Sequence, residues 1–126
     1  MGYNMKYFVP YLGISGKSFK YLIVNFGKYK GKKASDIVFR KLDYIDWCYD
    51  NLSNFKLTPS LSIDFKLGIK NKLVYAIQEK NSKNIEFCKY LCNKYKINYQ
   101  EIYEESLEDI SKIKEMNKYN VLGYNR

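Results

Sequence analysis

The chain has 126 residues and a formal net charge of +9, from 22 basic and 13 acidic side chains. It contains no histidine, which excludes Ser-His and Cys-His nucleophile pairs and removes the commonest general base. The longest apolar run, residues 21–24, is far too short to span a membrane.

The N-terminal part of the chain predicts strands. Residues 6–12 and 17–26 are rich in aromatic and β-branched side chains, and the Gly-Ile-Ser-Gly segment 13–16 separates them. Two such runs around a glycine-containing turn predict a β-hairpin. A second turn at residues 28–31 leads into a short third strand near residues 32–34.

Two helix starts follow this sheet. Ser35 can cap a short helix whose first turn carries Asp36, and Asp43 can cap the next one. Acidic residues in the first turn are stabilised by the exposed amide groups of a helix N-terminus. We therefore predict two short helices between residues 35 and 55.

Residues 58–77 carry a strong helical pattern. Thr58 followed by Pro59 favours a helix start, because proline fits the first helical position. Apolar residues then recur every four positions, at Leu61, Phe65, Ile69, Leu73 and Ile77. Residues 61–69 also alternate as a strand would, but the four-residue spacing continues through Ile77, so we predict a helix.

Further helix starts occur in the C-terminal part. Ser82 can cap a helix, and Asn98 with Glu101 has the spacing of a capping box. Ser106 and Asp109 can mark a second start within the last helical region.

These elements predict an α+β fold, with a small N-terminal antiparallel β-sheet of about three strands followed by four or five helices. We expect a single domain over residues 1–126. Its parts would be a basic β-rich part (1–34), a helical part (35–118) and a tail (119–126).

The positive charge is concentrated at the N-terminal end. Residues 1–35 contain seven lysines and no acidic residue, whereas residues 101–126 contain six acidic and four basic residues. A polyanion-binding surface is therefore expected near the N-terminus.

Within this end, residues 26–33 read Phe-Gly-Lys-Tyr-Lys-Gly-Lys-Lys. Gly27 and Gly31 can adopt a positive φ, so the backbone can reverse and leave the lysines pointing outwards. The cations can neutralise phosphates, and Tyr29 offers a face for base stacking. A solvated, lysine-rich hairpin is the alternative interpretation. The predicted nucleic-acid-binding residues are Lys17, Lys20, Lys28, Tyr29, Lys30, Lys32 and Lys33.

The spacing Phe-Gly-Lys-Tyr-Lys-Gly-Lys, a short helical stretch at 34–41 and then Tyr44-Ile45-Asp46-Trp47 resembles the small domain at the C-terminus of exodeoxyribonuclease X-like proteins. This domain also occurs alone, as a domain of unknown function, in phages and bacteria. The resemblance covers residues 22–55. In that family the domain accompanies a nuclease domain and is not itself the nuclease, so the resemblance implies accessory contact with nucleic acid.

Trp47 and Tyr44 allow two interpretations. A lone tryptophan in a small domain is most often a core residue that holds a helix against a sheet, which is the reading we favour. If it lay exposed beside the lysines, it would be a platform for base stacking.

Other chemistry has weaker support in the sequence. Asp43, Asp46 and Asp50 share one side of a helix and could bind a divalent cation, but we prefer to interpret them as first-turn helix acids and a solvated face. Residues 13–18 imitate the end of a phosphate-binding P-loop, yet Tyr11 stands where its first glycine is required. The odd number of cysteines predicts buried thiols in a reducing compartment. We predict no metal site and no cofactor.

We therefore expect a non-catalytic nucleic-acid-binding accessory module, such as a phage protein of DNA metabolism, in the cytoplasm of the cell. DNA is a more probable ligand than RNA, and a nuclease or another host or phage protein is a further candidate partner. One alternative is a phage-encoded inhibitor or interaction factor that uses the basic end or the acidic segment 99–109. Another is a magnesium-dependent nuclease, which the sequence favours least.

Overall fold

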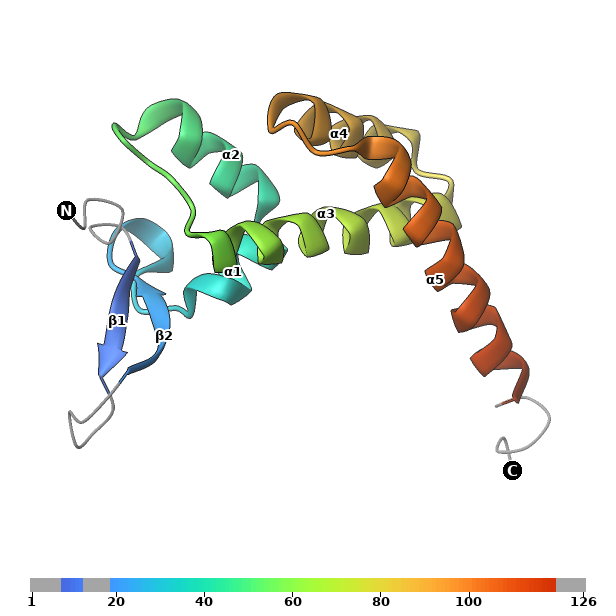
Figure 1. The fold of residues 1–126 in the computed structure, drawn as a ribbon, viewed down its shortest axis with the longest axis horizontal. Coiled ribbons are helices and arrows are strands. Elements are labelled where there is room, and N and C mark those ends of the chain that lie inside the picture. The colour runs from blue at the N-terminus through green and yellow to red at the C-terminus, as the bar shows by residue number, and fades with distance from the viewer. Residues whose placement is uncertain (1–7, 13–18, 120–126) are drawn as a thin grey trace. The chain divides into compact units, whose positions relative to one another are not determined.

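A computed structural model describes residues 8–12 and 19–119, which form two compact units (Figure 1). One unit ends at Gly68 and the other begins at Ile69. The elements are β1 (Phe8–Leu12), β2 (Phe19–Val24), a 3₁₀ turn (Gly27–Tyr29), α1 (Ala34–Arg40), α2 (Leu42–Asn51), α3 (Pro59–Glu79), α4 (Ser82–Lys94) and α5 (Tyr99–Tyr119). The predicted α+β class, with an N-terminal sheet followed by helices, is confirmed.

The sheet of the first unit is an antiparallel β1–β2 hairpin. Phe8 pairs with Val24 and Pro10 with Leu22, and the register shifts between Pro10 and Leu12. The predicted third strand is reduced to a single bridge between Ile23 and Lys33. It cannot extend further because α1 begins at the next residue. The turn predicted at residues 13–16 lies outside the described residues, as does the segment 13–18 that imitates a P-loop.

The helices of the first unit cover a core that begins at the sheet. Phe8 and Val24 are buried, and α1 contributes Ile37 and Val38 to the same unit. From α2, the residues Leu42, Ile45 and Cys48 are buried at helical spacing. Burial of such apolar side chains is the main stabilising contribution to a unit of this size.

The predicted helix over residues 58–77 is confirmed as α3. Thr58 Oγ1 accepts a hydrogen bond from the Leu61 amide at 3.2 Å, which caps the helix start. Four members of the predicted four-residue repeat are buried, namely Leu61, Phe65, Ile69 and Leu73. Gly68 lies where α3 passes closest to α1, because a Cβ atom at this position would collide with the carbonyl oxygen of Phe39.

Three other predicted starts are displaced toward the N-terminus, two of them by two residues and one by a single residue. α1 begins at Ala34 rather than after a Ser35 cap, and α2 begins at Leu42, which places Asp43 in its first turn. Neither helix has a side-chain cap, so packing of the buried Ala34 and Leu42 outweighs local capping. The start of α4 is capped by Asn81 instead of Ser82, through a bond from the Asn84 amide to Asn81 Oδ1 at 3.1 Å.

The second unit contains the end of α3 together with α4 and α5. Asn98 caps α5 as predicted, since its Oδ1 accepts from the Glu101 amide at 3.2 Å. The predicted second start is wrong, because α5 continues without interruption. The Ser106 hydroxyl donates to the Ile102 carbonyl one turn earlier, at 2.7 Å, and Ser106 is fully buried. A buried serine can remain within a helix when its hydroxyl is satisfied in this way.

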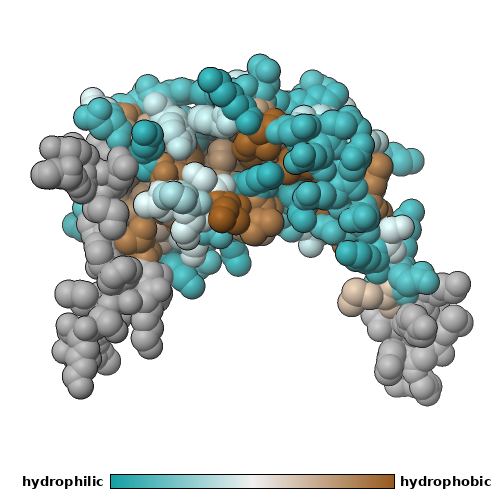
Figure 2. All heavy atoms as spheres, in the orientation of Figure 1, coloured by the Kyte–Doolittle hydropathy of each residue, from teal (hydrophilic) through white to brown (hydrophobic). Residues whose placement is uncertain are grey.

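The buried residues of α4 recur at helical spacing. Cys88, Leu91 and Cys92 are buried on one face of α4. On the face shown in Figure 2, hydrophilic atoms cover most of α5. Within the described part of the chain, no helix has the length and apolar character needed to cross a membrane.

Candidate functional site

The predicted lysine-rich turn is a closed loop in the first unit, which we call the lysine loop (residues 27–33). The Val24 amide donates to the Lys32 carbonyl at 2.9 Å, and the Gly31 amide donates to the Val24 carbonyl at 2.8 Å. Gly27 and Gly31 have φ values of +66° and +88°, as predicted from the sequence. These bonds tie the C-terminal end of the loop to the last residue of β2.

The lysines of this loop face solvent. Lys28, Lys30, Lys32 and Lys33 are all exposed, as predicted for phosphate-binding residues. Lys20 belongs to β2, but its side chain lies outside the described part of the structure, and so does the whole of Lys17. The structure therefore places four of the six predicted lysines on one short loop.

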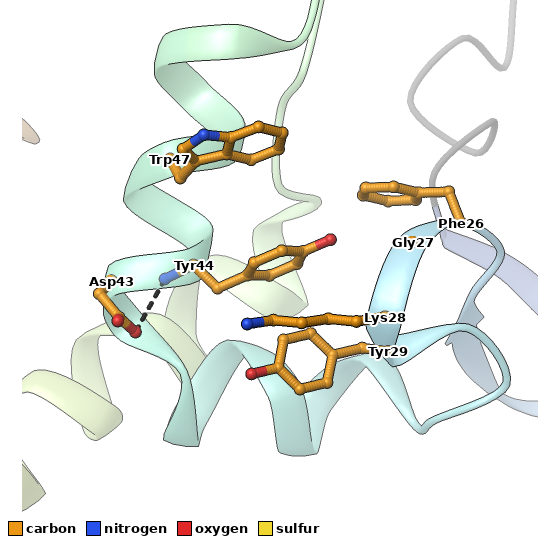
Figure 3. Close-up of a pocket in the computed structure, with 7 residues that line it drawn as sticks. All are labelled: Phe26, Gly27, Lys28, Tyr29, Asp43, Tyr44 and Trp47. Carbon is orange, nitrogen blue, oxygen red and sulfur yellow. Dashed lines mark hydrogen bonds between the residues drawn. The ribbon is translucent and has the colours of Figure 1, made fainter.

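Aromatic rings gather beside the lysine loop (Figure 3). The ring of Tyr44, from α2, stacks with Trp47 at a centroid distance of 5.9 Å and an interplanar angle of 13°. It also stacks with Phe26 at 6.3 Å and meets the edge of Tyr29 at 4.7 Å. Tyr44 is thus the common contact of three other rings, two from the loop region and one from its own helix.

Trp47 is not a core residue. Its side chain is 49% exposed, so the core interpretation that we favoured from the sequence is wrong. The reason is helical geometry: Ile45 and Cys48 face the core of the unit, and Trp47 lies about 200° around the helix from Ile45. Its ring is held at the surface by stacking on Tyr44.

Lys28 joins the cationic loop to these rings. Its Nζ lies 5.2 Å from the centroid of Tyr29 and 5.9 Å from that of Tyr44. Both distances are within the range of a cation–π interaction. In Figure 3 the Lys28 side chain extends from the 3₁₀ turn toward α2, alongside both rings. The ammonium group is therefore held near the aromatic faces instead of extending freely into water.

Together these residues line a pocket of about 570 Å³. Its wall is formed by Phe26, Gly27, Lys28, Tyr29, Asp43, Tyr44 and Trp47. The volume lies within the range of about 300–1,000 Å³ that is usual for small-ligand sites. The pocket combines apolar ring faces with one cation and one carboxylate, which is the composition of a site for a flat, partly charged ligand.

Tyr44 of the pocket wall and its neighbour Cys48 carry no charge at neutral pH. Burial raises the pKa of Tyr44, and the nearby Cys48 and Tyr29 raise it further. Burial also raises the pKa of the Cys48 thiol to about 11, although its hydrogen bond to Tyr44 lowers it somewhat. Neither group is therefore an activated nucleophile or base.

The acidic residues of α2 were considered from the sequence as ligands for a divalent cation. In the described ranges no three histidine, cysteine, aspartate or glutamate side chains come close enough to hold a metal ion. Asp43 and Asp50 are exposed, and Asp43 Oδ1 accepts a hydrogen bond from the Tyr44 amide at 2.9 Å. This bond gives Asp43 a structural role at the start of α2.

Of the seven residues that line the pocket, the predicted site included Lys28 and Tyr29 and left out the other five. Phe26 immediately precedes Gly27, and Asp43 was interpreted only as a helix cap or a possible metal ligand. Tyr44 was considered with Trp47 but not selected. The available signal was spacing, since Tyr44 and Trp47 are three residues apart on a helix and must share a face.

Comparison with protein families matches one segment of the chain. Residues 24–53 match the family described as exodeoxyribonuclease X-like C-terminal, which confirms the resemblance over this segment. The matched segment contains the lysine loop, α1 and α2, and therefore every residue that lines the pocket. The curated proteins and the solved structures give no significant match.

Proposed function

We propose that this chain is a non-catalytic nucleic-acid-binding accessory module of DNA metabolism. Lys28, Lys30, Lys32 and Lys33 bind phosphates, and the aromatic pocket beside them contacts a base. The observation that carries the proposal is the joining of these two features through Lys28, whose ammonium group lies within 5.2 Å and 5.9 Å of two ring centroids. The match to an exodeoxyribonuclease X-like C-terminal segment supports DNA as the ligand.

Four of the seven residues of the lysine loop are exposed lysines, which concentrates positive charge on one short segment. Such charge binds the phosphate backbone by releasing counterions, which makes the affinity fall steeply with salt. Phosphate contacts carry no sequence information, so we expect weak sequence specificity. Exposed aromatic rings beside the cations are the usual second component of such sites.

The test is fluorescence anisotropy of labelled DNA and RNA oligonucleotides across a salt series. A variant with Lys28, Lys30 and Lys32 changed to glutamine removes three of the proposed phosphate contacts. The matched control changes Lys83, Lys112 and Lys114, which are exposed lysines of the second unit, to glutamine. Both variants lose the same net charge, so a difference between them reports the position of the charge.

We expect the loop variant to bind more weakly and to flatten the salt dependence. Losing three contacts should reduce the slope of log affinity against log salt by about 2 for single strands and by about 3 for duplex DNA. The control variant should keep the original slope within error. Equal slopes in all three proteins, or no binding at moderate salt, would refute the proposal.

The alternative of a protein-interaction factor rests partly on the acidic first half of α5. Lys70 Nζ lies 3.6 Å from a Glu105 carboxylate oxygen and 3.5 Å from one of Asp109. These pairs join α5 to the middle of α3, which gives part of the acidic surface a structural role. We therefore prefer the nucleic-acid proposal, and a pull-down with the two lysine variants distinguishes a basic docking surface for protein from one for DNA.

A magnesium-dependent nuclease remains a separate proposal with its own test. It requires that Asp43→Asn and Asp46→Asn each abolish a magnesium-dependent cleavage of DNA. Under the binding proposal the unchanged protein shows no such cleavage.

A further inference from the structure

We infer that the pocket between the lysine loop and α2 receives an unpaired nucleobase, so that the chain prefers single-stranded DNA to duplex DNA. This inference rests on the proposed function and names its ligand more closely. It follows from the exposure of the aromatic rings, from the size of the pocket and from the placement of charge around it.

The first observation is that aromatic surface is accessible where a base could reach it. Trp47 is 49% exposed, and Tyr44 and Phe26 lie beside it in the pocket wall. In a duplex the faces of each base are covered by the neighbouring base pairs, so these rings have nothing to stack on. An unpaired base offers a free face, and stacking on aromatic side chains is the common way in which proteins hold single strands.

The second observation is the size and composition of the pocket. A volume of about 570 Å³ has room for one flat heterocycle with its sugar but not for a double helix. The lining is mainly aromatic, with Lys28 and Asp43 as its charged groups. This matches a base, which combines apolar faces with a polar edge.

The third observation is that the charges give the ligand a direction. Lys28 lies in the 3₁₀ turn and the other three lysines follow it, whereas Asp43 lines the pocket from α2 (Figure 3). A phosphate is attracted to the loop and repelled by the carboxylate. A phosphate bound by Lys28 lies near the Tyr29 and Tyr44 rings, because the Lys28 ammonium group is 5.2 Å and 5.9 Å from their centroids. The base of the same nucleotide then points toward Trp47, which stacks on Tyr44.

The chain offers a built-in probe for this site, because Trp47 is its single tryptophan. We would titrate the whole protein with a short single-stranded DNA, a duplex of the same length, and the same single strand carrying abasic sites. Tryptophan emission reports base stacking on Trp47, and anisotropy of the labelled DNA reports binding. The abasic strand keeps its phosphates but has no base to insert.

We expect single-stranded DNA to quench Trp47 emission and to bind more tightly than the duplex. The abasic strand and the duplex should bind through phosphates with little quenching. The Trp47→Ala variant should weaken single-strand binding by about 5- to 150-fold, the range found for loss of one stacked base, and change duplex binding less than twofold. Trp47→Phe should restore most of the single-strand affinity.

The matched control is Tyr75→Ala, since Tyr75 is an aromatic residue of the second unit that is 56% exposed. It should leave both affinities unchanged. Circular dichroism of each variant verifies that folding is intact, which is expected because both side chains are largely on the surface.

The outcomes separate this inference from the proposed function. Equal affinity for single strand and duplex, with a lysine-dependent salt slope but no tryptophan quenching, would overturn the unpaired-base site and leave the phosphate-binding function standing. Preference for single strands that is insensitive to Trp47→Ala would also overturn it. Absence of binding to every oligonucleotide would overturn both.

Discussion

Replacing Gly27 with alanine tests the link between the lysine loop and the aromatic pocket, and Gly31→Ala is its natural control. Both glycines have positive φ values, +66° and +88°. A Cβ atom at Gly27 would lie 3.0 Å from the Tyr44 hydroxyl oxygen, whereas one at Gly31 would have no neighbour within 4 Å. The two variants therefore share a backbone cost and differ in one contact.

The shared cost is that of placing an L-residue in the left-handed region, about 1–2 kcal/mol. The reduced flexibility of the unfolded chain does not offset it, because alanine cannot adopt this conformation without strain. At Gly27 the additional contact is closer than the ordinary van der Waals range of 3.4–4 Å, so Tyr44 must move by a few tenths of an ångström. Movement of the Tyr44 ring disturbs its stacking on Trp47, at a further cost on the order of 1 kcal/mol.

Urea denaturation followed by circular dichroism measures the loss of stability. Trp47 emission of the folded protein measures the disturbance of the Tyr44–Trp47 stacking. We expect Gly31→Ala to be less stable than the unchanged protein by about 1–2 kcal/mol and Gly27→Ala by about 2–3 kcal/mol. Only Gly27→Ala should change tryptophan emission and single-strand binding. A change of emission in Gly31→Ala, or full stability in both variants, would refute this account of the loop.

Three further predictions concern the core. Gly68→Ala should destabilise the chain by about 1–3 kcal/mol, because the new Cβ atom collides with the Phe39 carbonyl even though alanine has the better helix propensity. The control Asn71→Ala, on the exposed face of α3, should be neutral or slightly stabilising. Thermal unfolding of the two variants compares their stabilities. Burial raises the pKa of Cys48 and Cys88 from 9.0 to about 11, so the folded state holds these protons more tightly than the unfolded state. Stability in urea should be constant below pH 9 and fall between pH 9 and 11, and a stability that rises over this interval would contradict the assignment. Because the same two thiols are buried, they should react with a thiol reagent at neutral pH only as fast as the protein unfolds. Comparing the rate of labelling with the rate of unfolding tests this prediction.

Patterns with a local physical cause were predictable from the sequence. The α3 helix follows from apolar spacing and from the Thr58 cap, and the positive φ at Gly27 and Gly31 follows from the need to reverse the chain between charged residues. Each of these features depends on neighbours within a few positions. The α+β class was predictable for the same reason.

Helix starts that depend on tertiary packing were not predictable to the residue. α1 and α2 begin without side-chain caps, after Lys33 and Lys41. Ala34 is fully buried at the first of these starts, and its burial determines where the helix begins more strongly than the nearby Ser35 does. A sequence window contains the capping residue but not the surface against which the helix packs.

The position of Trp47 was predictable in principle, although we assigned it to the core. Ile45 and Cys48 were already expected on one helical stripe, and Trp47 lies outside this stripe. The general tendency of a lone tryptophan to be buried outweighed the periodicity of its own helix in our reasoning. Where the two disagree, helical periodicity is the stronger argument, because it is specific to the residues concerned.

The matched segment carries the site, but elements outside the segment hold it in place. Residues 24–53 include every pocket residue, yet Phe8 and Phe55 lie outside them and are buried with their rings 5.6 Å apart. Tyr49 joins α2 to this pair, because its ring meets Phe55 at 4.9 Å and its hydroxyl oxygen accepts from the Leu57 amide at 3.2 Å. The buried face of α2 therefore depends on β1 and on the segment after α2, and the exposed face of α2 carries Trp47. A peptide restricted to the matched segment would lose the contacts that orient α2, so the binding surface that we propose is a property of the first unit and not of the motif alone.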